Sequence, residues 1–262
     1  MKIATWNVNS VRKRTGNLVS WLGRAKPDVV VLQELKAQEP QFPKAEVEAA
    51  GYKVEMVGQK AFNGVALLSL HPVEITARSL PDSVDDEPAR YIEGKVSTPK
   101  GPVTVGGIYL PNGNPIGTEK FAYKIAWMDR LAQRARTLLA QEEMFVLGGD
   151  YNVIPTDVDV FSPKAFADDA LTQPESRRAL RSLINLGLTD AIRAIHVDGP
   201  QYTYWDYQAG AWQKDHGLRI DHLLLSPQAA DRLTAVGIDK AERGKPEPSD
   251  HVPVWCELDV GA

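Results

Sequence analysis

The sequence feature that most limits the fold is a run of four consecutive apolar residues, Val29 to Leu32. A strand with one face in water would alternate apolar and polar residues, so this run predicts a strand buried on both faces. Met144 to Leu147 is a second run of this kind. Strands buried on both faces require further layers of structure on either side of them.

Helical patterns alternate with these strands. The clearest helix spans about Thr118 to Ala140, because apolar residues recur there at intervals of three and four. Its expected apolar stripe consists of Phe121, Ile125, Met128, Ala132, Ala135 and Leu139. A helix near the N-terminus is expected to be capped by Asn9 or Ser10 and to bury Leu18, Val19 and Leu22. A shorter helix is expected near residues 175–186.

Further strands are expected near residues 3–6, 52–57, 63–70, 73–78, 90–97, 102–110, 221–225, 233–238 and 252–258. Two groups of strands with helices between them indicate an α/β fold with two sheets face to face and helices outside. The chain has 262 residues and shows no linker or low-complexity tract, so residues 1–262 are interpreted as a single domain.

Composition restricts the possible partners. The formal net charge of −4 argues against a protein that coats nucleic acid, although a local basic rim could still bind phosphates. The only cysteine, Cys256, follows a strand-like alternation and is expected to be a buried structural thiol. No stretch is long and apolar enough for a membrane span, and the start lacks the pattern of a signal peptide, so we expect a cytoplasmic protein.

Polar residues stand at the ends of several apolar strands, where layered α/β folds usually form their sites. They are Asn7 and Asn9, Gln33 and Glu34, Tyr109 and Asn112, Asp150 and Asn152, Asp221, and Asp250 with His251. Such a set suits phosphodiester hydrolysis, which needs oxygen ligands for a hard cation, an activated water, and donors for the charge that develops on phosphate oxygens. The sequence contains no zinc-type Cys/His cluster, Walker loop or Gly-x-Ser-x-Gly elbow.

At these positions the chain resembles the exonuclease III family of AP endonucleases, within the endonuclease/exonuclease/phosphatase superfamily that includes deoxyribonuclease I. The matching segments occur in the family's order and span nearly the whole chain. They are residues 6–10 (WNVNS), 32–36 (LQELK), 107–112 (GIYLPN), 149–152 (GDYN), 217–221 (GLRID) and 248–251 (PSDH).

The resemblance implies a four-layer α/β sandwich with two mixed β-sheets and a monomeric enzyme that depends on Mg²⁺ or Mn²⁺. It also implies incision 5′ of abasic sites in double-stranded DNA, with 3′-exonuclease and 3′-phosphatase activity on blocked 3′ ends. Glu34 matches the family's main metal ligand, and Asn9 and Asp250 are further candidate ligands. The sequence leaves open whether one or two ions bind.

The resemblance assigns catalytic roles to five motif residues. Asp150 would orient or deprotonate the attacking water, and Asn7 and Asn152 would fix its position. His251 would hydrogen-bond to Asp221 and present its other nitrogen to a phosphate oxygen. The opposite assignment, with His251 as the base and Asp150 as the proton donor to the leaving group, remains open.

Other matched positions predict contacts with DNA. Tyr109 would contact the scissile phosphate or assist proton transfer, and Asn112 would bind a phosphate oxygen. Arg90 and Lys120 match positions where relatives contact the DNA backbone. Weaker candidates for the same rim are Arg12, Lys13, Lys36 and Lys124.

A pocket for the extruded abasic sugar is implied by Tyr204, Trp205, Leu218 and Ile220, which match the residues that line it in relatives. For the aromatic pair the alternative is core packing, and Trp205 alone is compatible with that alternative. Trp212 is expected either on a DNA-facing loop or over the core. His216 is interpreted as a loop residue.

Two other functions remain possible at this stage. One is an enzyme of the same superfamily that acts on phosphoinositides, sphingomyelin or RNA, which would share the catalytic residues. The other is a catalytically inactive binding module on the same fold, which predicts gaps in the polar set. The sequence shows no such gap.

Overall fold

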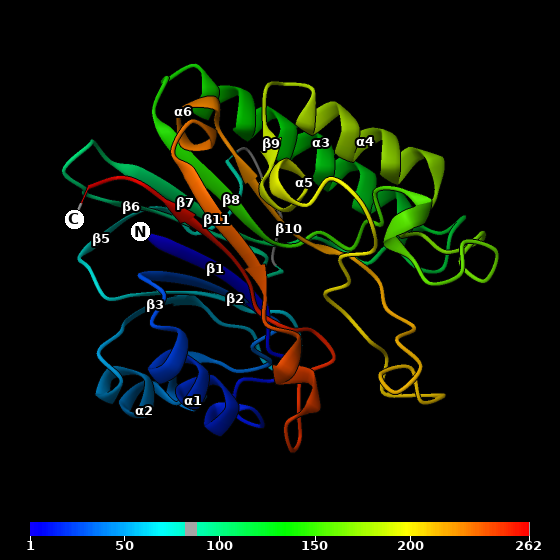
Figure 1. Ribbon diagram of the computed structural model, residues 1–262, viewed down its shortest axis with the longest axis horizontal. Helices are drawn as coiled ribbons and strands as arrows, with labels where there is room; N and C mark the ends of the chain where they lie inside the picture. The colour runs from blue at the N-terminus through cyan, green and yellow to red at the C-terminus, as the bar shows by residue number, and fades with distance from the viewer. Residues whose placement is uncertain (82–87, 262) are drawn as a thin grey trace.

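The computed structural model describes residues 1–81 and 88–261, which form two six-stranded sheets packed face to face (Figure 1). The first sheet contains, in spatial order, β11 (Leu233–Ile238), β12 (Val254–Leu258), β1 (Lys2–Asn7), β2 (Val29–Gln33), β4 (Val65–Ser69) and β3 (Lys53–Val57). The second contains β5 (Val73–Ala77), β6 (Tyr91–Val96), β7 (Val103–Tyr109), β8 (Met144–Asp150), β10 (Asp221–Leu225) and β9 (Thr189–Asp190).

Both sheets are mixed. β1 and β2 pair in parallel, as do β7 and β8, whereas their other neighbours are antiparallel. The apolar run in β2 is buried on both faces, as predicted. Val29 and Val31 belong to the cluster between the two sheets, whereas Val30 and Leu32 belong to the cluster beneath the first helices.

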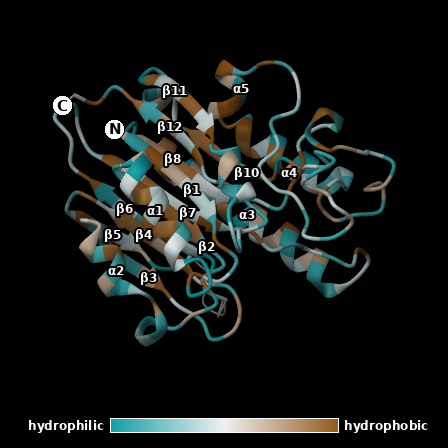
Figure 2. Ribbon diagram, turned by 60° about the horizontal axis from the view of Figure 1, so that its bottom comes forward, coloured by the Kyte–Doolittle hydropathy of each residue, from teal (hydrophilic) through white to brown (hydrophobic). Residues whose placement is uncertain are grey.

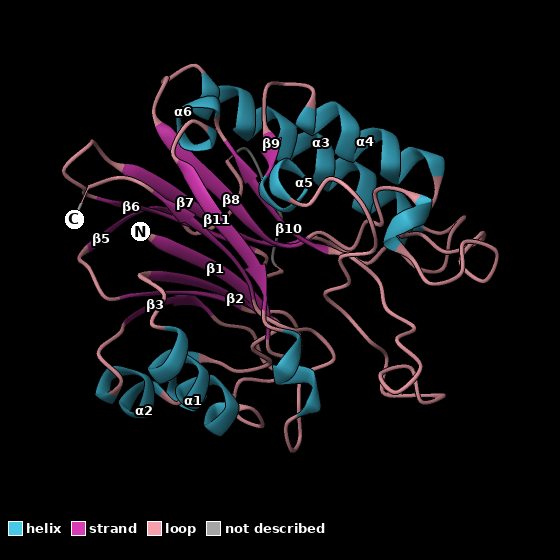
Figure 3. Ribbon diagram, in the orientation of Figure 1, coloured by secondary structure: helices cyan, strands magenta, loops and turns pink. Residues whose placement is uncertain are grey.

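Helices cover the outer face of each sheet (Figures 1 and 3). α1 (Thr15–Ala25) and α2 (Lys44–Ala49) lie against the first sheet, and α3 (Glu119–Leu139) and α4 (Pro174–Ile184) lie against the second. The short helices α5 (Ala191–Ile195) and α6 (Pro227–Ala230) follow β9 and β10. The order helix, sheet, sheet, helix confirms the predicted four-layer α/β sandwich, and Figure 2 shows hydrophobic residues concentrated along its strands.

The predicted strands are confirmed to within a few residues, but the cap of the first helix was wrong. α1 begins at Thr15 after Arg14, which makes no side-chain capping bond. Asn9 and Ser10 instead have positive φ angles of 42° and 84° in the preceding loop. That loop is held by hydrogen bonds to the segment after β2, including Ser10 N to Glu34 O at 2.8 Å.

The face of α3 was also misjudged. Of the expected stripe, Met128 and Ala135 are buried, but other members are only partly buried. The buried face is rotated toward Lys124, Trp127, Met128, Leu131, Ala135 and Leu138. Five of these six residues are apolar at spacings of three and four, so the sequence contains two overlapping apolar stripes, and only Lys124 lies outside such a pattern.

Cys256 is confirmed as a buried residue, and burial raises the pKa of its thiol to about 12. A thiol with this pKa stays protonated at neutral pH, which argues against a nucleophilic role. None of the helices in residues 1–81 and 88–261 is long and apolar enough to cross a membrane.

Candidate active site

Strand direction brings the polar residues to one edge of the sandwich. The carboxyl ends of β1, β2, β7 and β8 reach this edge because each pair is parallel. β10 and β12 run antiparallel to β8 and β1, so their first residues reach the same edge. In the second sheet Asp150 therefore stands opposite Tyr109 on one side and opposite Asp221 on the other.

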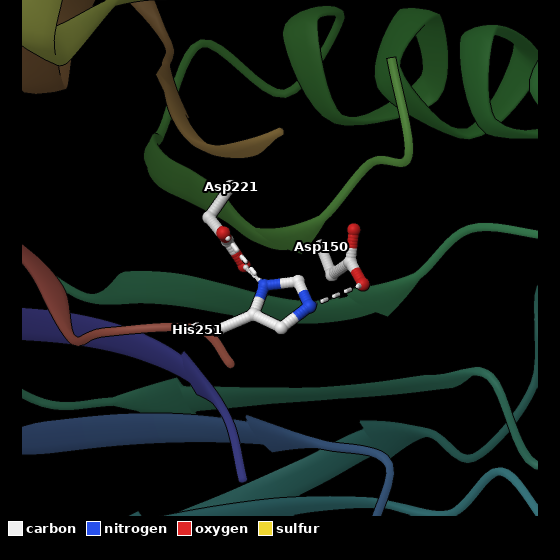
Figure 4. Close-up of side chains that lie close together, drawn as sticks. All are labelled: Asp150, Asp221 and His251. Atoms are coloured by element: carbon white, nitrogen blue, oxygen red, sulfur yellow. Dashed lines mark hydrogen bonds and ion pairs between the residues drawn. The ribbon is translucent and has the colours of Figure 1, made fainter. Parts of the chain in front are cut away.

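Asp150, Asp221 and His251 form a buried cluster at this edge (Figure 4). His251 Nδ1 lies 2.9 Å from Asp221 Oδ2, which confirms the predicted hydrogen bond. Its Nε2 faces Asp150 Oδ2 at 3.8 Å. Thr203, which the sequence did not single out, donates its hydroxyl to Asp221 Oδ2 at 2.6 Å. Asp221 therefore holds the orientation of the imidazole and is itself held by Thr203.

Two asparagines fix the carboxylate of Asp150. Asn7 Nδ2 donates to Asp150 Oδ2 at 3.0 Å, and the backbone N–H of Asn152 donates to Oδ1 at 2.9 Å. Asn152 adopts a left-handed conformation, with φ of 47°, that turns the chain back after β8. Its side-chain oxygen accepts from Asn112 Nδ2 at 3.0 Å, so the loops after β7 and β8 are tied together.

The surroundings of the site raise the pKa of both Asp150 and His251. Burial raises the pKa of Asp150 to about 7, because the charged carboxylate is poorly solvated there. Burial alone would lower the pKa of His251, but the carboxylates of Asp221 and Asp150 outweigh it and raise that pKa to about 10. Near neutral pH His251 is thus an imidazolium, whereas Asp150 exchanges a proton readily.

Tyr109 lines the site with Arg90 packed behind it. The Arg90 guanidinium lies 4.9 Å from the centre of the Tyr109 ring and donates to the Tyr109 carbonyl at 3.1 Å. Burial, with the nearby charges of Glu34 and Asp150, raises the pKa of Tyr109 well above its usual value. The phenol therefore stays neutral and can donate a hydrogen bond.

The proposed metal ligands form a connected corner beside this cluster. Lys36 Nζ contacts Glu34 Oε1 and Asn9 Oδ1, each at 2.7 Å. Asn9 Nδ2 in turn donates to Asp250 Oδ1 at 3.0 Å, and Asn7 Nδ2 donates to Glu34 Oε2 at 3.0 Å. Carboxylate and amide oxygens suit a hard divalent cation, and the ammonium in contact with two of them shows that positive charge is favoured here.

A cavity of about 550 Å³ opens beside the cluster. One wall is polar and includes Glu34, Tyr109, Asn112, Asp150, Asn152, Asp250 and His251. An apolar wall includes Tyr204, Leu218 and Ile220 at the positions expected from sequence, and Asp169, Asp206 and Gln208 also line the cavity. Tyr204 also packs edge-on against His251, with ring centroids 4.9 Å apart. The cavity thus joins the reacting groups to an apolar recess.

Several residues of the apolar wall were not predicted. Phe161, Phe166, Leu171 and His216 line the same recess, and His216 stacks on Phe161 with ring centroids 4.3 Å apart. His216 was interpreted only as a loop residue. Aromatic side chains within a proline-containing polar loop, residues 155–174, were the available signal for this wall.

Two predicted DNA contacts need correction. Trp205 is fully buried, and its ring packs against Trp212 with centroids 5.0 Å apart, so the core alternative holds for both residues. Lys124 is also fully buried, because its long side chain passes under the loops of the site rather than reaching solvent. Lys120, one turn earlier on α3, is exposed.

Comparisons with known proteins cover nearly the full chain. The model of the endonuclease/exonuclease/phosphatase family matches residues 4–251. Exodeoxyribonuclease III of Haemophilus influenzae is 31% identical over 270 residues, which is 98% of this chain and 100% of the relative.

Solved structures match equally well. An AP endonuclease from Archaeoglobus fulgidus has a TM-score of 0.93 and 35% identity and covers 99% of this chain and 100% of its own. The 3′ phosphatase NExo from Neisseria, bound to a product DNA hairpin, has a TM-score of 0.94 and 37% identity and covers 99% of both chains.

Proposed function

The chain belongs to the endonuclease/exonuclease/phosphatase family and is a DNA-repair nuclease, and we propose that it incises duplex DNA 5′ of abasic sites and removes blocking groups from 3′ ends. The observation that carries this proposal is that Asp150 and His251 of the buried cluster line a cavity together with the apolar side chains of Leu218 and Ile220.

Asp150 is proposed as the general base. Asn7 and the backbone of Asn152 hold its carboxylate, and burial raises its pKa, which makes it a better proton acceptor, whereas the carboxylates of Asp221 and Asp150 raise the pKa of His251 and favour its protonated form. A water aligned by Asp150 would give up a proton and attack phosphorus. The bond from phosphorus to the 3′ oxygen of the neighbouring nucleotide would break, and that oxygen would take up a proton from solvent, with the neutral phenol of Tyr109 able to assist the transfer. His251, held by Asp221, would stabilise the negative charge that develops on a phosphate oxygen.

Phosphate binding is assigned to groups that line the polar wall. Asn112 and Asn152 present amides toward the cavity, and Tyr109 presents a neutral phenol. Arg90 packs against the ring of Tyr109, and the exposed Lys120 would contact the DNA backbone. Contacts of this kind set register and orientation on the duplex.

Glu34, with Asn9 and Asp250, would hold Mg²⁺ or Mn²⁺. The cation supplies positive charge that offsets the charge on the phosphate in the transition state. Lys36 contacts an oxygen of Glu34 and an oxygen of Asn9, so it would help to hold both side chains in place for the ion.

Substrate choice follows from the recess. Its apolar wall, including Leu218 and Ile220, suits a sugar that has lost its base. Extruding such a nucleotide needs no unstacking of a base, which lowers the cost of entry relative to an intact nucleotide. A terminal phosphate on a 3′ end reaches the same polar wall without any extrusion.

The proposal can be tested on three labelled duplexes: one with an abasic-site analogue, one with a 3′-phosphate and one intact with a recessed 3′ end. Each is incubated with Mg²⁺, with Mn²⁺ or with EDTA, using the wild type and Asp150→Asn. A metal-dependent cut at the lesion and loss of the 3′-phosphate, both abolished by Asp150→Asn, would support the proposal. A ladder from the recessed end would add exonuclease activity, and no cleavage of the first two duplexes would refute the proposed substrates.

A further inference from the structure

Lys124 is a buried lysine beneath the catalytic loops. It lies in the second turn of α3 and is 0% exposed. Its Nζ donates to two backbone carbonyls, that of Asn112 at 3.0 Å and that of Asn152. One of these carbonyls belongs to the loop after β7 and the other to the loop after β8. A single amine thus joins the two loops that carry the proposed phosphate-binding amides.

Neighbouring residues pack closely against the side chain of Lys124. Gly113, with φ of 90°, lies against the side chain so closely that an added Cβ would stand 2.6 Å from Lys124 Cδ. Asn112 and Asn152 also bond to one another through their side chains at 3.0 Å. Asn152 Nδ2 donates to the Leu110 carbonyl at 3.0 Å. These bonds join the loops in two ways, through the side chain of Asn152, which bonds to Asn112 and Leu110, and through Lys124.

We propose that Lys124 is a positioning residue for phosphodiester hydrolysis, which holds the loops after β7 and β8 so that the amides of Asn112 and Asn152 face the scissile phosphate. The role rests on the proposed function, because it acts through residues assigned to phosphate binding there. Lys124 touches neither DNA nor the reacting atoms, since Asn112, Gly113 and Asn152 cover it.

Burying an ammonium group costs free energy. A lysine that joins two loops at this cost argues for a role beyond folding. The two described acceptors are carbonyls rather than carboxylates, and burying a charge without a contacting counter-ion is costly. The charge is instead attracted to Asp150 and Asp169, which lie on the cavity side of the loops. Burial lowers the pKa of Lys124 to about 7, and the neutral amine still has two N–H groups for the two carbonyls.

The test compares Lys124→Met, which keeps the length and removes the donors, with Lys124→Gln, which keeps amide donors without the charge. Arg136→Met, at the exposed C-terminal end of the same helix, is the control for loss of a positive charge. Asn152→Ala is made alone and in combination with Lys124→Met. The 3′-phosphate duplex gives kcat and KM for each variant, with the thermal unfolding midpoint and the Mg²⁺ activation curve measured in parallel.

The expected result for Lys124→Met is a loss of roughly 10–100-fold in kcat, as for other groups that orient a reacting side chain, with KM changed by less than about threefold. Lys124→Gln should retain part of the rate. The Mg²⁺ activation curve should not shift, because Lys124 contacts none of the proposed metal ligands. In the Asn152→Ala background, Lys124→Met should cost a smaller factor in kcat than it does in the wild type, since one of the two side chains that it positions is gone.

A change confined to KM, or losses that multiply fully in the double variant, would overturn the proposal. If both Lys124 variants fail to fold while Arg136→Met folds, Lys124 is required for the fold itself and the positioning role is rejected. An inactive wild type in the same assay would count against the proposed function instead.

Discussion

Replacing Asp159 with asparagine should lower the free energy of unfolding substantially at pH 7 and much less near pH 3. Asp159 is fully buried and accepts from Arg219 Nε at 2.7 Å and from Arg193 at 2.6 Å. Thr156 donates to it as well, at 2.7 Å. Arg219 continues to Asp190 at 2.7 Å, so this carboxylate is at the centre of a buried charge network behind the recess.

The magnitude follows from the pKa. Burial alone would raise the pKa of Asp159, but the hydrogen bonds and charge of Arg219 outweigh it and lower the pKa from 3.8 to about 2. That difference corresponds to about 2 kcal/mol of stability at pH 7. Since the folded-state pKa is depressed, the contribution is complete above pH 4 and is lost as pH falls toward 2. At pH 3 roughly half of this contribution should remain.

Urea unfolding of wild type and Asp159→Asn at pH 7 and pH 3 measures this contribution. At each pH it is the free energy of unfolding of the wild type minus that of the variant, so the contributions of carboxylates common to both proteins cancel. Asp157→Asn is the matched control, because Asp157 also pairs with an arginine, Arg177, at 2.9 Å but its side chain is 68% exposed. Exposed pairs contribute at most about 1 kcal/mol, so the control should change little at either pH. An equal loss for Asp159→Asn at both pH values would refute the assigned ionisation.

Three further predictions concern the site. Glu34→Ala should abolish most metal-dependent cleavage while the far-UV circular dichroism spectrum is retained, and wild-type rates at all Mg²⁺ concentrations would contradict its role as a ligand. Alanine variants of Asp221 and His251 should lose similar amounts of kcat, and the double variant little more, because the two act as a unit; fully additive losses would show independence. Trp205→Ala should destabilise the fold by about 3–5 kcal/mol in urea unfolding, as expected for a buried aromatic residue. A stable variant that had only lost DNA affinity would show that Trp205 contacts DNA instead of packing in the core.

The layers of the fold could be predicted because local pattern and burial agree. The run in β2 is apolar throughout and lies between a helical layer and the second sheet, so its sequence alone predicts burial on both faces. α3 shows the opposite case, since its buried face includes Lys124, which only the carbonyls of two distant loops make tolerable. Partners that are far apart in sequence leave no trace in a local pattern.

The site divides in the same way. Motif residues such as Asp150 and His251 could be found because strand ends converge on one edge, and this holds for any side chain at those positions. Thr203, Phe161 and His216 lie on loops, whose path over the surface depends on tertiary contacts, such as the stacking of His216 on Phe161. Trp205 occupies a motif position yet faces the core, because resemblance in sequence does not give the direction of a side chain.

Four consecutive residues show how closely recognition, stability and chemistry are coupled in this chain. Leu218 and Ile220 line the recess, whereas Arg219 between them is buried and bonded to Asp159 and Asp190. Asp221, the next residue, holds His251. Because neighbouring side chains in an extended segment point in opposite directions, the charge network that anchors Arg219 also sets the wall of the recess and the start of β10. Loss of that network would therefore disturb the wall of the recess and the catalytic cluster together, although neither Asp159 nor Arg219 lines the recess.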